Sequence, residues 1–305
     1  MLYFFIWVTI EKNKKEEIMK LDEECKGCLY KSQLGKVEKE QKDGRKVELF
    51  KKEVKQLCDN PLENYCAPLL MRDIDLCHRK IFGEGIDYSK EKSLFNNLIL
   101  KTESELYTKI ISSPDPLEEA LKFSMTANYI DFARMSDLDV NVVSSVIAAS
   151  GRASVDGKIL NIFKEKLKSA KTLCFLHDNC GEIVLDKILI KIIKKLYPQI
   201  STTSVVRGEE IINDATIKDA AEIDLFSVAQ VIKNGANVPG TYLKEVSPEV
   251  VKLLSESDVI ISKGLGNLET LYGEGFPAFY AFNCKCNHIA ERFNLPLWSA
   301  GFIYG

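Results

Sequence analysis

The chain has 305 residues, a formal net charge of −3 and a sequence pI near 5.8. This length is sufficient for a large core and for about two structural units. The slightly acidic balance excludes the basic face that nucleic-acid binding requires, so we expect no nucleic-acid partner. The nine cysteines are odd in number and scattered, unlike the framework of a small secreted domain, and therefore indicate a reducing, cytoplasmic location.

The first ten residues are apolar, but a helix needs about 20 apolar residues to cross a bilayer. No basic segment precedes them and no small-residue cleavage site follows, so we expect neither a membrane anchor nor a signal peptide. We interpret residues 1–18 as an extension without a function, because Met19 begins a sequence typical of a domain start. A change of pattern then divides the chain into a helical domain, 19–165, and an α/β domain, 166–305.

Residues 20–170 contain few β-branched runs and favour helices. Asp115 and Pro116 are typical of a helix start, and Gly151 is typical of a helix end. These signals and the spacing of apolar residues predict helices over 48–58, 62–81, 91–111, 117–129 and 141–149.

From residue 171 onward, short apolar runs alternate with helical patterns. The run 172–176 is bounded by polar residues, as a buried parallel strand should be. Such alternation predicts a mostly parallel, Rossmann-like sheet flanked by helices. Strands are predicted over 172–176, 204–206, 259–262 and 279–282, with helices over 183–196, from 215 onward and over 248–255.

Acidic and amide side chains follow two of these strands. Asp178 and Asn179 come after the first, and Asn213 and Asp214 come after the second. Ligands of open α/β sheets bind beyond the carboxyl ends of the strands, and carboxylate and amide oxygens suit a hard cation such as Mg²⁺ or Mn²⁺. Helix capping is the alternative for each pair. Capping alone does not explain the repeated Asp/Asn chemistry, or Glu182 close behind the first pair.

A third polar segment, Ser262 to Asn267, follows another predicted strand. Gly264 and Gly266 allow the backbone to approach a ligand, and Lys263 offers a positive charge to a phosphate. The lysine precedes the glycines, so the segment is not a P-loop, and an ordinary turn is the alternative. After the first strand, Gly181 opens a helix whose positive N-terminal end favours an anion.

Taken in order, these segments resemble the damage-control phosphatase family, also called domain of unknown function 89. The main matches are Asp178-Asn179-x-Gly181-Glu182, Arg207-Gly208 to Asn213-Asp214-Ala215-Thr216, and Lys263-Gly264-x-Gly266-Asn267. Further matches at Cys25-x-x-Cys28, Asn128 to Phe132 and Lys285-Cys286 extend the similarity over about residues 22–300. His177, Cys180, Leu265 and Leu268 depart from the residues usual in the family, so the resemblance does not define the substrate.

The resemblance implies metal-dependent hydrolysis of phosphate monoesters of small metabolites, such as sugar phosphates or damaged phosphorylated metabolites, with Mg²⁺, Mn²⁺, Co²⁺ or Ni²⁺. Carried over by position, it implies that Asp178, Asn179 and Asp214 bind the metal, and that Asp178, Glu182 and Asp214 are catalytic. The substrate contacts that it implies are Asn128, Asp131, Asn213, Lys263, Gly264, Gly266, Asn267 and Lys285.

Several alternatives stay open from the sequence. The nucleophile could be Asp178, or a water on the metal activated by Glu182 or Asp214. An S-adenosylmethionine-dependent methyltransferase would use a similar sheet, although the expected glycine-rich turn after the first strand is absent. A non-enzymatic metal- or ligand-binding protein is the third reading, and it would not need Asp178 or Asp214. The oligomeric state is not predicted.

The pair Cys25 and Cys28 could hold zinc together with other cysteines, act in redox chemistry, or stay reduced on a helix. No second Cys-x-x-Cys supports zinc, and the βαβ context of a redox motif is missing. We interpret Cys284 and Cys286 as core residues. His177, beside the expected metal ligands, could support them or contact the substrate.

Overall fold

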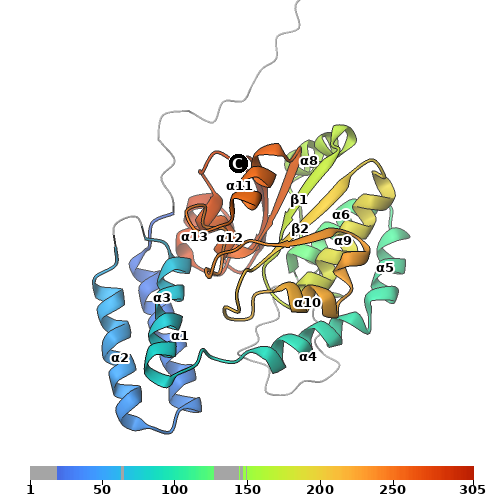
Figure 1. The fold of residues 1–305 in the computed structure, drawn as a ribbon. Coiled ribbons are helices and arrows are strands. Elements are labelled where there is room, and N and C mark those ends of the chain that lie inside the picture. Colours follow the sequence, from blue (N-terminus) through green and yellow to red (C-terminus); the bar gives the residue numbers. More distant parts are fainter. Residues whose placement is uncertain (1–18, 63–64, 127–143, 145–146, 149) are drawn as a thin grey trace, which may run out of the picture.

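The computed structural model describes residues 19–62, 65–126, 144, 147–148 and 150–305. A six-stranded sheet in the second half of the chain has helices on both faces, and the first three helices form a separate group beside it (Figure 1). The α/β fold with a helical N-terminal region is therefore confirmed. The extension 1–18, Asn128, Asp131 and most of the helix expected over 141–149 lie outside the described residues.

The first half is helical, as expected. Asp22, Asp43 and Asp156 each accept hydrogen bonds from backbone N–H groups at the start of a helix, which explains where those helices begin. The helices are α1 Glu23–Glu40, α2 Gly44–Asp59, α3 Ala67–Phe82, α4 Ser89–Leu100, α5 Glu103–Ile111, α6 Pro116–Thr126 and α8 Gly157–Ser169.

The single helix expected over 91–111 is wrong, because two helices, α4 and α5, occupy that stretch. The backbone turns at Thr102, whose hydroxyl donates to the carbonyl of Ile99 at 2.8 Å. A threonine that satisfies a helix-end carbonyl in this way competes with continuation of the helix. The apolar spacing continues across the turn, so periodicity alone did not reveal the break.

The sheet has the strand order β3-β2-β1-β4-β5-β6, and every strand is parallel to its neighbours except β6. Its strands are β1 Thr172–Leu176, β2 Ser201–Val206, β3 Gln230–Lys233, β4 Val259–Lys263, β5 Phe279–Asn283 and β6 Ala300–Tyr304. The helical elements between them are α9 Glu182–Leu196, α10 Ile217–Glu222, the short 3-10 helix Leu225–Ser227, α11 Pro248–Glu256, α12 Gly264–Leu271 and α13 Asn287–Phe293.

Alternate residues of the central strands enter two different cores. In β1, Leu173 and Phe175 pack with helices α4 to α6, α8 and α9, whereas Cys174 and Leu176 pack with α11 to α13. This two-sided burial is why the central strands are continuous apolar runs that the sequence reveals. The edge strands β3 and β6 are only partly buried and lack such a run, and neither was predicted.

Helices α1 to α3 enclose their own core, which Val238 of the second half joins. Helices α4 to α6 and α8 instead share a core with the sheet. The expected boundary between residues 165 and 166 lies inside α8, and the division into two domains stays a prediction. In the part of the chain that the structure describes, no helix is both long enough and apolar enough to cross a bilayer.

Candidate active site

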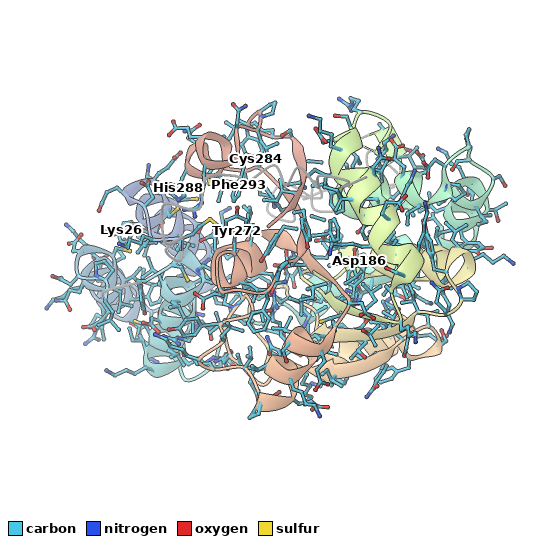
Figure 2. All side chains as sticks on the ribbon, turned by 90° about the horizontal axis from the view of Figure 1, so that it is seen from above. Lys26, Asp186, Tyr272, Cys284, His288 and Phe293 are labelled. Atoms are coloured by element: carbon cyan, nitrogen blue, oxygen red, sulfur yellow. The ribbon has the colours of Figure 1, made fainter. Side chains whose placement is uncertain are left out.

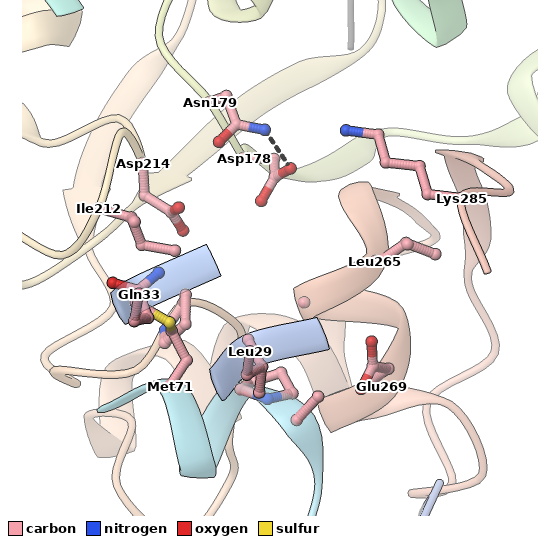
Figure 3. Close-up of a pocket in the computed structure, with 14 residues that line it drawn as sticks. Leu29, Gln33, Met71, Asp178, Asn179, Ile212, Asp214, Leu265, Glu269 and Lys285 are labelled. Carbon is pink, nitrogen blue, oxygen red and sulfur yellow. Dashed lines mark hydrogen bonds between the residues drawn. The ribbon is translucent and has the colours of Figure 1, made fainter. Parts of the chain in front are cut away.

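The site lies where the strand order reverses, between β1 and β4. Asp178 follows β1 and Gly264 follows β4, so both flank the position where open α/β sheets bind their ligands. A cleft of about 280 Å³ opens there, between the sheet and helices α1 and α3 (Figure 3). Its lining residues are Leu29, Gln33, Ala67, Pro68, Met71, Asp178, Asn179, Ile212, Asp214, Pro239, Leu265, Gly266, Glu269 and Lys285.

Backbone pairing brings the two acidic motifs together. The N–H of Cys180 donates to the carbonyl of Asn213 at 2.9 Å, and the N–H of Ala215 donates to the carbonyl of Asp178 at 2.7 Å. Asn179 and Asp214 form the antiparallel bridge between them. Neither acid caps a helix: α9 begins after Gly181, and α10 is capped by Thr216. The structure therefore brings Asp178, Asn179 and Asp214 together, and their binding of a metal stays a prediction.

A buried arginine links the two carboxylates from behind the cleft. Arg207 follows β2 directly and is 1% exposed. Its Nε donates to Oδ2 of Asp214 at 2.5 Å, one terminal nitrogen donates to Oδ1 of Asp178 at 3.3 Å, and the other donates to Oδ1 of Asn267 at 3.0 Å. The rigid guanidinium fork thus fixes the positions of both acids.

The carboxylates outweigh this single positive charge. Burial, together with the carboxylates of Asp214 and Glu182, raises the pKa of Asp178 well above its usual range. Burial also raises the pKa of Asp214, although Arg207 opposes that change. Two buried acids that repel each other at the base of a cleft favour an added cation.

The side chain of Lys263 lies beneath the cleft, whereas the sequence predicted that it would contact a phosphate in the cleft. Its ammonium is fully buried and is not part of the cleft lining. It donates to Glu182 at 2.5 Å, to Asp186 at 2.8 Å and to the carbonyl of Ser124 at 2.7 Å. Burial lowers the pKa of Lys263, but the two carboxylates outweigh burial and raise it above its usual value. The lysine therefore fixes α9 to β4, and its contact with a substrate stays a prediction.

His177 also lies beneath the cleft. Its Nδ1 contacts Asp186 at 3.1 Å and its Nε2 contacts the hydroxyl of Ser204 at 2.9 Å. Burial lowers the pKa of His177, so the ring is neutral at neutral pH and donates from Nδ1 to the carboxylate. Of its two expected roles, support of the site agrees with this position, because the ring is buried and lies outside the cleft lining.

Asn267 connects Arg207, which holds the two acids, to the residues that lie beneath the cleft. Its amide nitrogen donates to the carbonyls of His177 at 3.0 Å and Lys263 at 2.7 Å, while its oxygen accepts from Arg207 and Thr241. These four bonds use the whole side-chain amide, so Asn267 positions its neighbours. The segment that we expected as a glycine-rich turn is the first turn of α12.

The backbone N–H of Gly181, at the N-terminal end of α9, is not available to the anion that the sequence indicated there. The glycine precedes the helix as expected, with a positive φ of 79°. Its N–H, however, donates to the side-chain oxygen of Asn96 at 2.7 Å. Of the other expected substrate contacts, Lys285 and Gly266 line the cleft, whereas the side chain of Asn213 does not.

A family model for the damage-control phosphatase ARMT1-like domain matches residues 21–297. The chain belongs to this family. A damage-control phosphatase of Archaeoglobus fulgidus is 29% identical over 289 residues, covering 90% of this chain and 95% of that protein. An uncharacterised protein of Methanocaldococcus jannaschii is 28% identical, covering 92% and 94%. A damage-control phosphatase of Pyrococcus horikoshii is 33% identical over a shorter stretch, 59% of this chain and 62% of that protein.

The fold is also that of a solved family structure. The crystal structure of a protein of the DUF89 family from Pyrococcus horikoshii superposes with a TM-score of 0.83 at 25% identity. It covers 94% of this chain and 99% of that one. The family match over residues 21–297 and this structural similarity confirm the resemblance expected from the sequence.

Sequence reasoning missed several residues of this ARMT1-like site. Arg207 was noticed only as part of a matched segment, although a charged residue directly after an apolar strand was a usable signal. Gln33 and Glu269 enter the cleft from α1 and α12, and no local pattern indicated them. Ile212 adopts a φ of 44°, which is strained for a β-branched residue, at the turn that delivers Asp214.

Glu269 is a half-buried acid on the cleft wall that accepts a hydrogen bond from the N–H of Ala67. Burial, followed by the nearby Cys286, raises the pKa of Glu269 to about 8. Since its pKa in the unfolded chain is about 4.3, the folded protein holds this proton more tightly between the two values. The carboxyl therefore removes stability as pH rises from about 4 to about 8.

We expect Glu269→Gln to remove this pH dependence. The amide still accepts from Ala67 and never ionises, so the variant should gain about 1–3 kcal/mol over the wild type between pH 5 and pH 9. Urea unfolding at pH 5, 7 and 9 measures the difference. Glu291→Gln, at an exposed glutamate of α13, is the matched control and should follow the wild type. Parallel curves for Glu269→Gln and the wild type would contradict the assignment.

Proposed function

We propose that this chain is a metal-dependent phosphatase that hydrolyses phosphate monoesters of small metabolites, such as sugar phosphates or damaged phosphorylated metabolites. The observation that carries this proposal is the convergence of Asp178, Asn179 and Asp214 in one cleft, with Lys285 facing Asp178 across it (Figure 3). Membership of the damage-control phosphatase family supports the phosphatase over the methyltransferase reading and over the non-enzymatic reading.

The residues present fit a hard divalent cation. Oδ1 of Asp178 accepts from Arg207 and Oδ2 of Asp178 accepts from Asn179, while Oδ2 of Asp214 accepts from Arg207. Each carboxylate oxygen has two lone pairs, so both side chains can also bind a cation. Asn179 donates from its nitrogen to Asp178 at 2.6 Å, which leaves its carbonyl oxygen as a third ligand. Mg²⁺, Mn²⁺, Co²⁺ or Ni²⁺ bound here would offset the repulsion between the acids and polarise the phosphoryl group. Among the described residues, no three His, Cys, Asp or Glu side chains form a metal site, so water and the substrate would supply the other ligands.

The protein side chains perform the remaining tasks. Lys285 supplies positive charge to the phosphate from the wall opposite Asp178. Arg207 holds Asp178 in a fixed orientation. Asp178 then either attacks phosphorus itself or accepts a proton from an attacking water. Rapid quenching with a radiolabelled substrate distinguishes the two routes, because only direct attack produces a phosphorylated protein.

The cleft itself limits the substrate to a small molecule. Its volume of about 280 Å³ is at the lower end for small-molecule sites. Away from the acids, apolar side chains such as Leu29, Met71 and Leu265 alternate with the polar groups of Gln33 and Glu269. We infer that the organic part of the ester is compact and carries hydrogen-bonding groups.

The proposal is tested with purified protein, a panel of phosphate monoesters and each of the four metals, with a chelator as the blank. We expect metal-dependent phosphate release that ranks sugar phosphates or damaged phosphometabolites highest. Absence of release from folded, metal-loaded protein across the panel would overturn the proposal. Binding of S-adenosylmethionine in an equilibrium titration would favour the methyltransferase alternative.

Gly264→Ala is expected to lower phosphate release by about a hundredfold, because a Cβ at this position would lie 2.0 Å from Oδ2 of Asp178. Gly264 also has a φ of +77°, so part of any effect comes from backbone strain. Gly275→Ala is the matched control, since Gly275 has a φ of +86° and no atom within 4 Å of the added Cβ. Steady-state kinetics and melting temperatures of both variants separate the two causes. Equal activity losses would contradict a specific displacement of Asp178.

A further inference from the structure

Two cysteines from distant parts of the chain are hydrogen-bonded to each other. Cys25 lies on α1, and Cys286 comes directly before α13. Their thiols form a side-chain hydrogen bond. The adjacent residues also touch, because the Asn287 amide donates to the Glu24 carboxylate at 3.0 Å. Figure 2 shows Lys26 of α1 on the same side of the molecule as Cys284 and His288.

This contact changes the interpretation of the Cys-x-x-Cys motif. Cys28 lies one turn further along α1 and is exposed, and the contact with Cys286 is made by Cys25. All nine cysteines lie in the described part of the chain and are free thiols, and no three metal-binding side chains gather there. The zinc reading therefore has no support from the structure. The pair that the fold forms is Cys25 with Cys286, and Cys286 is not the buried core residue that we expected.

The two thiols are chemically unequal. The hydrogen bond from Cys25 lowers the pKa of Cys286 to about 7, and the same bond raises the pKa of Cys25. At neutral pH a substantial fraction of Cys286 is therefore thiolate, with the protonated Cys25 beside it. A thiolate is the form that peroxides oxidise, and a neighbouring thiol can resolve the product. Both residues are only half-buried, so a small oxidant can reach them.

We propose that Cys25 and Cys286 form a redox-sensitive pair that hydrogen peroxide converts into a disulfide between α1 and the start of α13. In the first step the Cys286 thiolate attacks peroxide, so that an S–O bond forms, the O–O bond breaks and hydroxide leaves. In the second step the Cys25 sulfur attacks the sulfenic acid, its S–O bond breaks, and water leaves with the Cys25 proton. The thiolate and the thiol lose two electrons in total as the S–S bond forms. Peroxide is reduced to one water and one hydroxide, which takes a proton from solvent to become the second water.

The disulfide would tie together two walls of the catalytic cleft. Cys25, Leu29 and Gln33 have the i, i+4, i+8 spacing that places them on one face of α1, and the latter two line the cleft. Lys285, which precedes Cys286, lines the opposite wall. A covalent link at this point restricts the separation of α1 from the sheet. Resting on the proposed phosphatase function, we expect oxidation to lower kcat/KM by about tenfold and reduction by dithiothreitol to restore it.

Peptide mapping tests the covalent step without any activity measurement. The full chain is treated with peroxide, capped with iodoacetamide and digested under non-reducing conditions. We expect a cross-linked Cys25–Cys286 peptide in the wild type and in Cys28→Ser, and none in Cys25→Ser or Cys286→Ser. A Cys25–Cys28 disulfide, a sulfinic acid on Cys286 without a cross-link, or unmodified thiols would each overturn the proposal.

Thermal melting gives a second test that does not depend on whether the Cys25→Ser and Cys286→Ser variants fold. The oxidised wild type should melt at a higher temperature than the reduced wild type, because the disulfide closes a very long loop. Cys28→Ser should show the same rise. If the cross-link forms and activity is unchanged, the link to the cleft is overturned. If the protein is no phosphatase at all, mapping and melting still decide the disulfide.

Discussion

Replacing Asp178 with asparagine is expected to lower phosphate release by at least about a thousandfold, equivalent to about 4 kcal/mol of transition-state stabilisation, and to leave the fold intact. The substitution keeps the shape of the side chain and removes a charge that the proposed mechanism uses both to bind the metal and for attack or proton transfer. Arg207 keeps its shorter contact, to Asp214 at 2.5 Å. Burial and the repulsion from Asp214 and Glu182 raise the pKa of Asp178, and a neutral asparagine avoids both costs, so the metal-free variant should be at least as stable as the wild type.

Asp214→Asn is the informative comparison. It should lose activity to a similar extent, but it also removes the nearest carboxylate from the buried Arg207. Arg207 then keeps only its longer contact, 3.3 Å to Asp178. Losing the shorter charged hydrogen bond costs about 1.5–3 kcal/mol, so this variant should unfold at lower urea concentration. Kinetics with saturating metal and unfolding in EDTA give both quantities for both variants. Wild-type activity in Asp178→Asn would remove Asp178 from the catalytic machinery.

The central strands could be predicted from the sequence because their burial on both faces leaves a local pattern of apolar residues. Strands β1, β4 and β5 are buried on both faces, and each is an apolar run between polar residues. The polar residues that follow such strands must lie at one edge of a parallel sheet. The positions of Asp178 and Asp214 after two neighbouring parallel strands therefore predicted that these two side chains lie close together.

Other parts of the site depend on tertiary contacts that leave no local pattern. Gln33 reaches the cleft from α1, which packs on α3, and α3 in turn packs on α12. Cys25 meets Cys286 because the same helix α1 also touches the start of α13. Asp186 lies in the middle of an apolar helix, where the sequence shows no partner for it. The direction of the Lys263 side chain was also invisible, because the residue after a strand can point into the cleft or under it.

The buried position of Lys263 shows that the site has two layers of charged residues. Asp178 and Asp214 line the cleft and Arg207 holds them from behind, and Lys263, Asp186 and His177 form a second layer beneath. Glu182 belongs to both, since it accepts from Lys263 and lies 3.5 Å from the amide nitrogen of Asn179. The positions of the acids that line the cleft therefore depend on the charge balance of the buried layer.

Lys263→Met is expected to destabilise the protein by about 3–5 kcal/mol at pH 7, because Glu182 and Asp186 lose the cation that they share. Burial alone would raise the pKa of Asp186, but Lys263 and His177 hold it below its usual value. A carboxylate with a lowered folded pKa contributes stability above its unfolded pKa, and this stability is lost as pH falls through the folded value. The deficit of Lys263→Met should therefore be largest above about pH 5 and should shrink below about pH 4.

Urea unfolding of Lys263→Met and the wild type at about pH 3 and at pH 7 measures this change. The double variant Lys263→Met with Asp186→Asn is the control, because removing both members of a buried pair costs less than removing one, so it should recover part of the loss at pH 7. If Lys263 instead acts mainly on the substrate, Lys263→Met would lose phosphate release and keep its wild-type unfolding curve at both pH values. The two outcomes place the lysine either beneath the catalytic carboxylates or among the groups that contact the phosphate.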